Sequence, residues 1–298
     1  MGMTSTTFDQ QLERVAAGEP LAAEVIRELA KAPDILPLGM LADALRRRLH
    51  GTRSSYVRLA VCPFDASFSD AVPVSAREVR IGGHPPSFDV AIAAVQAARA
   101  VAGDRAVSGL SWADVARYAE SGTTIARVLR ALRDAGLDSL AELPLDHLDE
   151  ADDVFGPLKH AGFERVRVTV DKLAAAQRTD SFLRVAEWQR RFGCIAAINP
   201  LPLAVTAFRP TTGYEDVKMV AVARLAAPEV PHIQIDWQRY GPKLAQVALT
   251  FGADDVDGVS AADDAPDGRR RAPLEEIRRN IQAAGFEPVE RDGRFTSR

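Results

Sequence analysis

The residues most able to do chemistry in the first half of this sequence are two glycines and a histidine. Gly82, Gly83 and His84 follow a short apolar run. Two glycines at the end of a strand let the backbone approach a ligand closely and expose its N–H groups, and His84 would add an acid, a base or a ligand atom. The same residues also suit a tight turn without function, so these residues alone leave both interpretations open.

The two cysteines, Cys62 and Cys194, exclude a disulfide scaffold and favour a reducing compartment, so we expect a cytoplasmic protein. No group of cysteines and histidines has the spacing of a zinc site, and no nucleophile elbow, P-loop or complete dinucleotide-binding fingerprint occurs. A lone cysteine is more often a small buried hydrophobe than a nucleophile. The sequence therefore predicts no metal site and no complete catalytic constellation.

The segment 231–258 holds the second group of candidate residues. A strand that ends at Trp237 runs into a helix, and an acidic loop with Asp254 and Asp255 then leads into another short strand. Residues at the carboxyl ends of the strands face the site in a β/α barrel, so Trp237 and the loop 254–258 are candidates for contacting a ligand. A core tryptophan and a solvated acidic loop are the alternatives.

A recurring pattern of helix, glycine and short apolar strand must position these residues. The glycines that end the helices are Gly136, Gly162, Gly193 and Gly285. Helices that alternate with short strands predict parallel strands, and no Gly- or Ser-rich linker divides the chain. We predict an N-terminal helical segment, residues 1–55, followed by one α/β domain, residues 56–298, folded as a β/α barrel, with an open doubly wound sheet as the alternative.

The composition limits the kinds of partner. The chain has 298 residues, of which 47% are hydrophobic, and a formal net charge of −4, so it can form a core and is not expected to be disordered. The mild acidity argues against a broad nucleic-acid surface. The apolar run 196–207 contains prolines and falls short of the roughly 20 residues that cross a bilayer. We expect no nucleic acid and no membrane among its partners.

A resemblance to a known family is carried by residues 231–258, PHIQIDWQRYGPKLAQVALTFGADDVDG. This stretch resembles the C-terminal part of the radical-SAM enzymes of the futalosine route to menaquinone, which are aminofutalosine synthase and dehypoxanthine futalosine cyclase, with the deazaflavin FO synthase as a cousin. Residues 210–225, 272–295 and 16–51 resemble further helices of that family. The resemblance implies a TIM-type barrel with N-terminal helices, and S-adenosylmethionine and a four-iron–four-sulfur cluster in active members.

The sequence departs from this family where the cluster would bind. The family holds its cluster with Cys-x-x-x-Cys-x-x-Cys, and in the similar segment here only Cys62 remains, with Ala66 and Ser69 at the other two positions. Alanine cannot bind iron, and a serine alkoxide substitutes poorly for a thiolate. The turn at Gly82 follows Ser69 after only thirteen residues, so we expect one β/α unit of the barrel to be trimmed.

The resemblance also implies which residues form the site. Gly82 and Gly83 resemble the family's Gly-Gly-x-His-Pro turn, which contacts the methionine end of S-adenosylmethionine, although the acidic residue for its ribose falls near Ser111. The glycine-rich loop of the family is replaced by residues 141–144. The predicted substrate-binding residues are His84, Trp237, Asp254 and Asp255.

Three functions stay open on this basis. The first is a relative that has lost cluster and radical chemistry, needs no cofactor, and binds a small nucleoside-like ligand or an active radical-SAM paralogue. The second is an active synthase- or cyclase-like enzyme with an atypical cluster, and the third is a structural protein of an assembly. A pocket shared by Trp237, Asp254 and Asp255 with the Gly82 turn would favour ligand binding. A pocket filled by Phe64, Phe68 or Trp112 would favour assembly.

Overall fold

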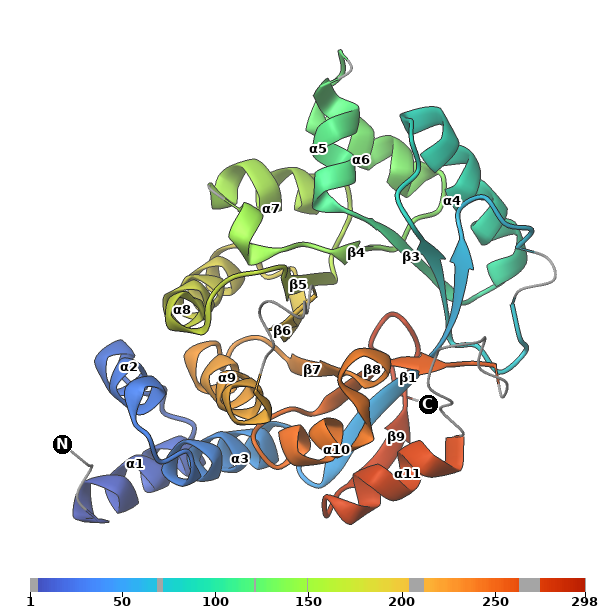
Figure 1. Ribbon diagram of the computed structural model, residues 1–298. Coiled ribbons are helices and arrows are strands. Elements are labelled where there is room, and N and C mark those ends of the chain that lie inside the picture. The colour runs from blue at the N-terminus through green and yellow to red at the C-terminus, as the bar shows by residue number, and fades with distance from the viewer. Residues whose placement is uncertain are drawn as a thin grey trace.

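The computed structural model describes residues 5–68, 72–120, 122–148, 150–203, 212–262 and 274–297, so Ser69 lies outside the described residues. Eight parallel strands form a nearly closed barrel, in the order β4-β3-β2-β1-β8-β7-β6-β5 (Figure 1). A ninth strand, β9, pairs with β1. The strands are β1 (Arg53–Pro63), β2 (Glu78–Gly82), β3 (Ala106–Ser111), β4 (Ser139–Glu142), β5 (Val166–Val170), β6 (Ile195–Pro202), β7 (His232–Asp236), β8 (Asp255–Ser260) and β9 (Glu287–Glu290).

The barrel has its seam between β4 and β5. The described residues there form a single parallel bridge between Pro144 and Thr169, and the Thr169 amide donates a hydrogen bond to the Leu143 oxygen at 3.0 Å. The remaining neighbours form regular parallel ladders. The predicted β/α barrel is therefore confirmed, in place of an open doubly wound sheet.

Helices surround the strands and bury their apolar faces against them. The four glycines predicted to end helices all have positive φ, between 66° and 110°, as a left-handed stop requires. The helices are α1 (Ser5–Ala17), α2 (Ala23–Lys31), α3 (Leu36–His50), α4 (Phe88–Ala102), α5 (Trp112–Glu120), α6 (Ile125–Asp134), η1 (Leu145–His147), α7 (Ala151–His160), α8 (Ala175–Phe192), α9 (Gly213–Ala226), α10 (Trp237–Leu249) and α11 (Leu274–Ala283).

The connection from β1 to β2 is the trimmed part of the barrel. The described residues of this connection, 64–68 and 72–77, contain no helix, whereas each later connection between consecutive barrel strands contains at least one α-helix. The short interval between Ser69 and Gly82 predicted this difference, because it has no room for both a helix and a strand. The trimmed TIM-type barrel is thus confirmed.

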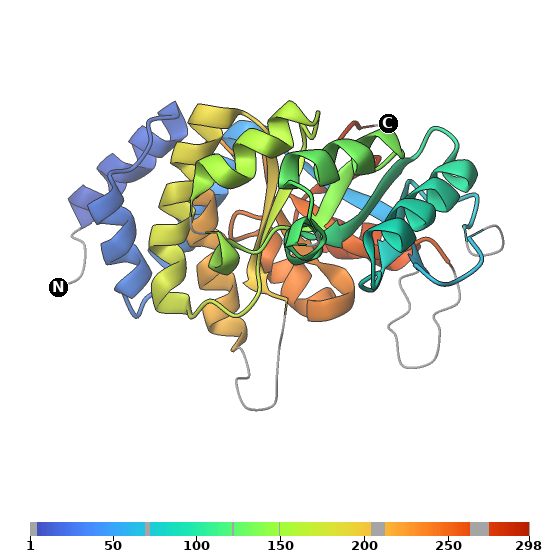
Figure 2. The same cartoon turned by 90° about the horizontal axis from the view of Figure 1, so that it is seen from above.

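The N-terminal helices α1, α2 and α3 lie together at one side of the barrel (Figure 2). Helix α3 packs against α9 and against α1. Strand β1 begins at Arg53, slightly before residue 56, where the barrel was predicted to begin. None of the helices in the described ranges combines the length and the apolar character needed to pass through a bilayer.

The interior of the barrel is charged, and four of its residues form what we call the barrel-floor network. Arg80 binds both carboxylate oxygens of Asp257, at 3.0 and 3.1 Å, and one oxygen of Glu78 at 2.7 Å. Arg167 lies 3.3 Å from Asp257. Buried charges persist in a fold only when they are paired, so these two acids and two arginines stabilise one another across β2, β5 and β8.

Candidate functional site

A pocket of about 570 Å³ opens at the carboxyl ends of the strands, and we call it the mouth pocket. This is the end at which β/α barrels carry their active sites. The ends of β1, β2, β3, β4, β7 and β8 contribute to its lining, and its apolar side chains are Leu59, Val61, Ile81, Leu110 and Ala141. Its polar side chains are Arg80, His84, Ser111, Glu142, Asp236, Gln238 and Arg239.

The Gly82–Gly83 turn lines the mouth pocket, as does His84. Gly83 has a φ of +83°, and a Cβ atom there would lie 3.1 Å from the ring of Phe64. A Cβ at Gly82 would lie 3.2 Å from Val61. The positive φ favours glycine at position 83, and at both positions a side chain would press against a neighbouring residue. A role of this turn in binding a cofactor stays a prediction.

His84 is held at the pocket by a buried carboxylate. Its Nδ1 lies 3.1 Å from Asp114, which also accepts hydrogen bonds from the Ser111 amide and hydroxyl, both at 2.9 Å. Against the cost of burial, these hydrogen bonds lower the pKa of Asp114. The His84 side chain is 69% exposed, so its other ring nitrogen is open to a ligand or to solvent.

Sequence reasoning missed Asp114, although a local signal was present. The Ser111 hydroxyl accepts a hydrogen bond from the Asp114 amide at 3.2 Å, while the Asp114 carboxylate reaches back to the Ser111 amide. This reciprocal pattern is a capping box at the start of α5, and its spacing, Ser-x-x-Asp, is visible in the sequence. What the spacing could not reveal is that the same carboxylate holds His84 from another loop.

Asp236 is another site residue that sequence reasoning missed, as are the pocket side chains of Arg80, Glu142, Gln238 and Arg239. It is the last residue of β7 and caps α10, because its Oδ1 accepts a hydrogen bond from the Arg239 amide at 2.8 Å. Burial and the carboxylate of Asp257 raise the pKa of Asp236. A raised pKa favours the protonated carboxyl, which can donate a hydrogen bond.

The structure does not bring Trp237, Asp254 or Asp255 to the mouth pocket. Trp237 is 1% exposed and belongs to the core. The prediction expected the loop 254–258, which leads into a strand, to face the site, but β8 itself runs from Asp255 to Ser260, and of these five residues Gly258 is the one in the described lining of the pocket. Asp254 and Asp255 therefore lie at the amino end of β8, opposite the mouth. This placement corrects the expected pocket shared with Gly82 and Gly83.

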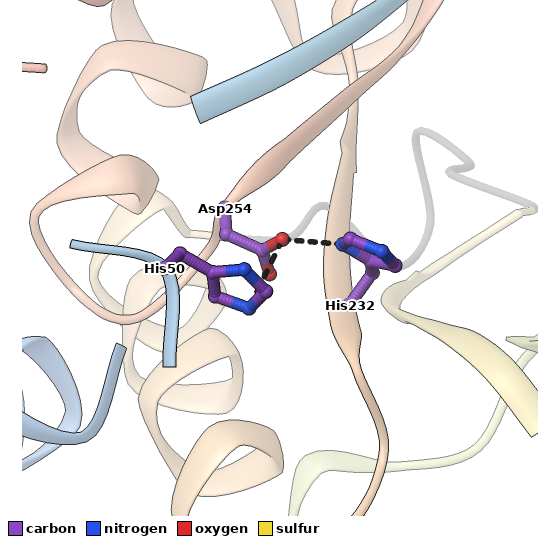
Figure 3. A group of neighbouring side chains, drawn as sticks. All are labelled: His50, His232 and Asp254. Carbon is purple, nitrogen blue, oxygen red and sulfur yellow. Dashed lines mark hydrogen bonds and ion pairs between the residues drawn. The ribbon is translucent and has the colours of Figure 1, made fainter. Parts of the chain in front are cut away.

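Asp254 is the centre of an ion-pair cluster at the amino end of the barrel (Figure 3). One oxygen pairs with Arg224, and the other lies 2.6 Å from His232 Nδ1 and 3.5 Å from His50 Nε2. Against the cost of burial, His232 and Arg224 hold the pKa of Asp254 far below its usual range. Together these contacts join α3, α9, β7 and the start of β8.

The same cluster has residue types that bind metals, but its hydrogen bonds argue against that role. His50 Nε2 lies 2.9 Å from the Pro231 carbonyl oxygen, which only accepts, so this nitrogen carries the proton and has no lone pair for an ion. The guanidinium of Arg224 on the same carboxylate would also repel a cation. We interpret His50, His232 and Asp254 as a structural cluster.

The two cysteines lie at opposite ends of the barrel. Cys62 is the second-last residue of β1, whereas Cys194 directly precedes β6. Among the described residues, the pocket lining includes Val61 but not Cys62, and successive side chains of a strand point to opposite faces. The Cys62 side chain accordingly points outward into the hydrophobic core, where it is 0% exposed. Burial raises the pKa of both thiols.

Solved structures share this architecture. The [FeFe]-hydrogenase maturase HydG superposes with a TM-score of 0.67 at 14% identity, covering 96% of this chain and 76% of HydG. Methylornithine synthase (PylB) superposes with a TM-score of 0.67 at 13% identity, covering 94% of this chain and 97% of that enzyme. The chain therefore shares the β/α barrel fold of these two enzymes.

Sequence comparisons add relatives that cover most of the chain. Residues 203–298 match the family described as the CofH/MqnC C-terminal region. The chain is 28% identical, over 85% of its length and 91% of the other protein, to 5-amino-6-(D-ribitylamino)uracil–L-tyrosine 4-hydroxyphenyl transferase of Archaeoglobus fulgidus. It is 26% identical, over 95% of its length and 94% of the other protein, to aminodeoxyfutalosine synthase of Thermus thermophilus. The chain is a relative of the radical-SAM family of the futalosine route, which confirms the resemblance.

Proposed function

We propose that this protein is a ligand-binding relative of the futalosine-type radical-SAM enzymes that assembles no iron–sulfur cluster and performs no radical chemistry by itself. The observation that carries the proposal is the placement of Cys62. A cluster needs thiolates that converge on one point in the site. Cys62 points away from the mouth pocket, and burial raises the pKa of its thiol, which favours the neutral form.

The rest of the chain does not make up for this placement. Ala66 stands where a second thiolate would be expected and offers no ligand atom. Cys194 lies at the amino end of the barrel, with its carbonyl oxygen bound to the Val166 amide at the start of β5. Moving its thiol to the mouth would require the barrel to rearrange. The residues present therefore do not fit a cluster, and we derive no step through one.

The mouth pocket supports ligand binding rather than a purely structural role. Phe64, Phe68 and Trp112, which would fill the pocket in an assembly protein, are not among the described residues that line it. The lining carries several hydrogen-bonding and charged side chains instead. Polar groups that converge on a concave site are typical of small-molecule sites. We propose a small, polar, nucleoside-like ligand, with an active radical-SAM paralogue as the other proposed partner.

Measuring iron and sulfide per chain after anaerobic reconstitution tests this proposal. We expect background iron in the wild type, in Cys62→Ala and in Cys194→Ala. The Cys194→Ala variant is the matched control, because it removes a buried thiol from the other end of the barrel. A near-stoichiometric cluster in the wild type and in Cys194→Ala, lost in Cys62→Ala, would overturn the proposal and favour an active enzyme with an atypical cluster.

A further inference from the structure

Two neighbouring aspartates beside the mouth pocket have different partners. Asp236 ends β7 and Asp257 lies in β8, and the two are register partners in the parallel ladder between these strands. Register partners project to the same face of a sheet. Asp236 lines the pocket, and Asp257 binds Arg80 and Arg167 inside the barrel, so both carboxyls face the interior. Two acids thus share one region of the site.

Among the described residues, arginine side chains form ion pairs with only one member of this pair. Asp257 takes two hydrogen bonds from Arg80 and lies 3.3 Å from Arg167. Within the described ranges, no arginine or lysine forms an ion pair with Asp236, whose Oδ1 accepts from the backbone amide of Arg239. When two carboxyls lie close together, the one without a cation is the one that keeps a proton.

Gly258 holds the Asp236 carboxyl in its position. Gly258 has a φ of +74°, and a Cβ atom there would lie 2.7 Å from Asp236 Oδ1. The β8 backbone therefore packs directly against the acid, and only a glycine leaves room for it. With one oxygen bound to the Arg239 amide and packed on Gly258, the carboxyl has a defined orientation at the wall of the pocket.

We propose that the Asp236–Asp257 pair carries a single negative charge, on Asp257, and that Asp236 is a neutral carboxylic acid that donates a hydrogen bond to a carboxylate group of the ligand. Burial and Asp257 raise the pKa of Asp236. Against the cost of burial, Arg167 and Arg80 hold the pKa of Asp257 well below its usual range. The acid with the lowered pKa is thus the one that pairs with arginines, and the acid with the raised pKa is the one that does not.

The side chains beside Asp236 indicate which chemical group of a ligand would bind there. An ionised Asp236 would repel a ligand carboxylate, whereas a neutral acid donates to it in a strong, charge-assisted hydrogen bond. Arg239, from the first turn of α10, lines the same pocket and adds a positive charge. A small molecule with a carboxylate therefore fits this wall. This ligand class rests on the proposed ligand-binding function, whereas the protonation of Asp236 does not.

Several charged groups face Asp236 and must be considered in any pH test. Asp257 on β8, Arg80 on β2 and Arg239 on α10 are the nearest, and their charges act on its proton affinity. Glu142 on β4 and His84 after β2 belong to other walls of the pocket, and Tyr240 on α10 interacts with Asp236 as well. A variant of Asp236 itself isolates its proton from all of these.

The pH dependence of the stability of the ligand-free protein tests whether Asp236 is protonated. A carboxyl with a raised folded-state pKa stabilises the fold at low pH, and this contribution is lost as the pH rises through the folded pKa. Asp236→Asn keeps the cap and the hydrogen-bond donor but does not titrate. The ratio of its folding equilibrium constant to that of the wild type should therefore rise above pH 4, by up to about tenfold per pH unit, until the pH passes the folded-state pKa of Asp236. Asp236→Ser serves as a second variant with a capping side chain.

The matched control is Asp134→Asn, an exposed aspartate on α6, which should track the wild type at every pH. A constant difference between Asp236→Asn and the wild type from pH 4 to pH 9 would overturn the protonation of Asp236. This outcome is independent of the iron measurement, because it needs neither ligand nor cluster. Failure of the proposed function and failure of this inference are thus distinguishable.

Acetate, as a minimal carboxylate probe, tests the ligand class. We expect acetate at pH 6 to raise the Tm of the wild type and of Asp236→Asn saturably, relative to chloride at the same ionic strength. Asp236→Ala, which has no donor, should lose at least half of that shift. Equal effects of acetate and chloride on the wild type, or an acetate shift unchanged in Asp236→Ala, would overturn the assignment.

Discussion

Arg291 and Asp255 form a two-pronged ion pair at the amino end of the barrel. Arg291 Nε lies 2.5 Å from Asp255 Oδ1 and Nη2 lies 2.6 Å from Oδ2, and both side chains are buried. Gln234 and Ser55 donate to the same carboxylate at 2.7 and 2.5 Å. Arg291 directly follows β9, so this pair joins the C-terminal segment to three barrel strands.

Removing Arg291 should strongly destabilise the fold. The substitution Arg291→Met leaves Asp255 as a buried charge without its cation, and breaking a buried pair in this way costs about 3–5 kcal/mol. Urea unfolding of Arg291→Met against the wild type measures the loss. Arg279→Met, an exposed arginine on α11, is the control and should stay within about 0.5 kcal/mol of the wild type. Equal stability of the two variants would contradict a structural role for the pair.

His50 should make the protein sensitive to mild acid. Burial lowers the pKa of His50 in the folded state, so the unfolded chain binds a proton there that the folded protein resists. Stability is therefore present above about pH 6.5 and is lost as the pH falls below it. His50→Gln should flatten the fall in unfolding free energy between pH 7 and pH 5.

The control for His50 is His160→Gln, since His160 is exposed on α7. Its pH profile should follow the wild type, with the same fall in unfolding free energy below pH 6.5. If His50→Gln kept that fall as well, the proton responsible would belong to another group.

Gly258→Ala should disturb Asp236. The new Cβ would lie 2.7 Å from the Asp236 carboxyl and would force it to move. Gly103→Ala is a matched control, because Gly103 also has a positive φ, +59°, but has nothing within 4 Å of its Cβ position. We expect Gly258→Ala to lose about 1–3 kcal/mol more than Gly103→Ala, as overpacking does. Comparable losses would mean that the Asp236 carboxyl moves aside at little cost.

Both thiols should be unreactive in the native protein. Cys62 and Cys194 are buried, and burial raises the pKa of each thiol, so little thiolate is available to attack a disulfide reagent. We expect slow modification in buffer and two fast thiols per chain in denaturant. A fast native thiol that disappears in Cys62→Ala would instead indicate that Cys62 reaches the solvent at the mouth.

Much of the fold could be predicted from local sequence. Glycines that end helices require a positive φ, and this requirement acts within a few residues, so Gly193 and its equivalents were identified correctly. The short interval before Gly82 predicted the missing helix for the same reason, since chain length limits what a connection contains. The turn at Gly82, Gly83 and His84 was likewise placed at the mouth, because it follows the end of a strand.

The site could be predicted only in part, because its partners come from distant segments. The acidic segment 254–258 was expected to face the site although it leads into a strand, whereas β8 already begins at Asp255, so Asp254 and Asp255 lie at the end of the barrel opposite the mouth. The role of Asp114 depends on His84, and that of Asp236 depends on Asp257, across pairs of elements that the sequence does not place side by side.

The sequence by itself determined the β/α barrel, its trimmed first unit and its relation to the radical-SAM family, because each of these depends on local patterns and spacing. Only the tertiary structure decided which way Cys62 points and which acids lie at the mouth. It also decided that Asp257, and not its neighbour Asp236, forms ion pairs with arginines. The physical reason is that charge, burial and proton affinity depend on the distances between side chains, and the fold sets those distances.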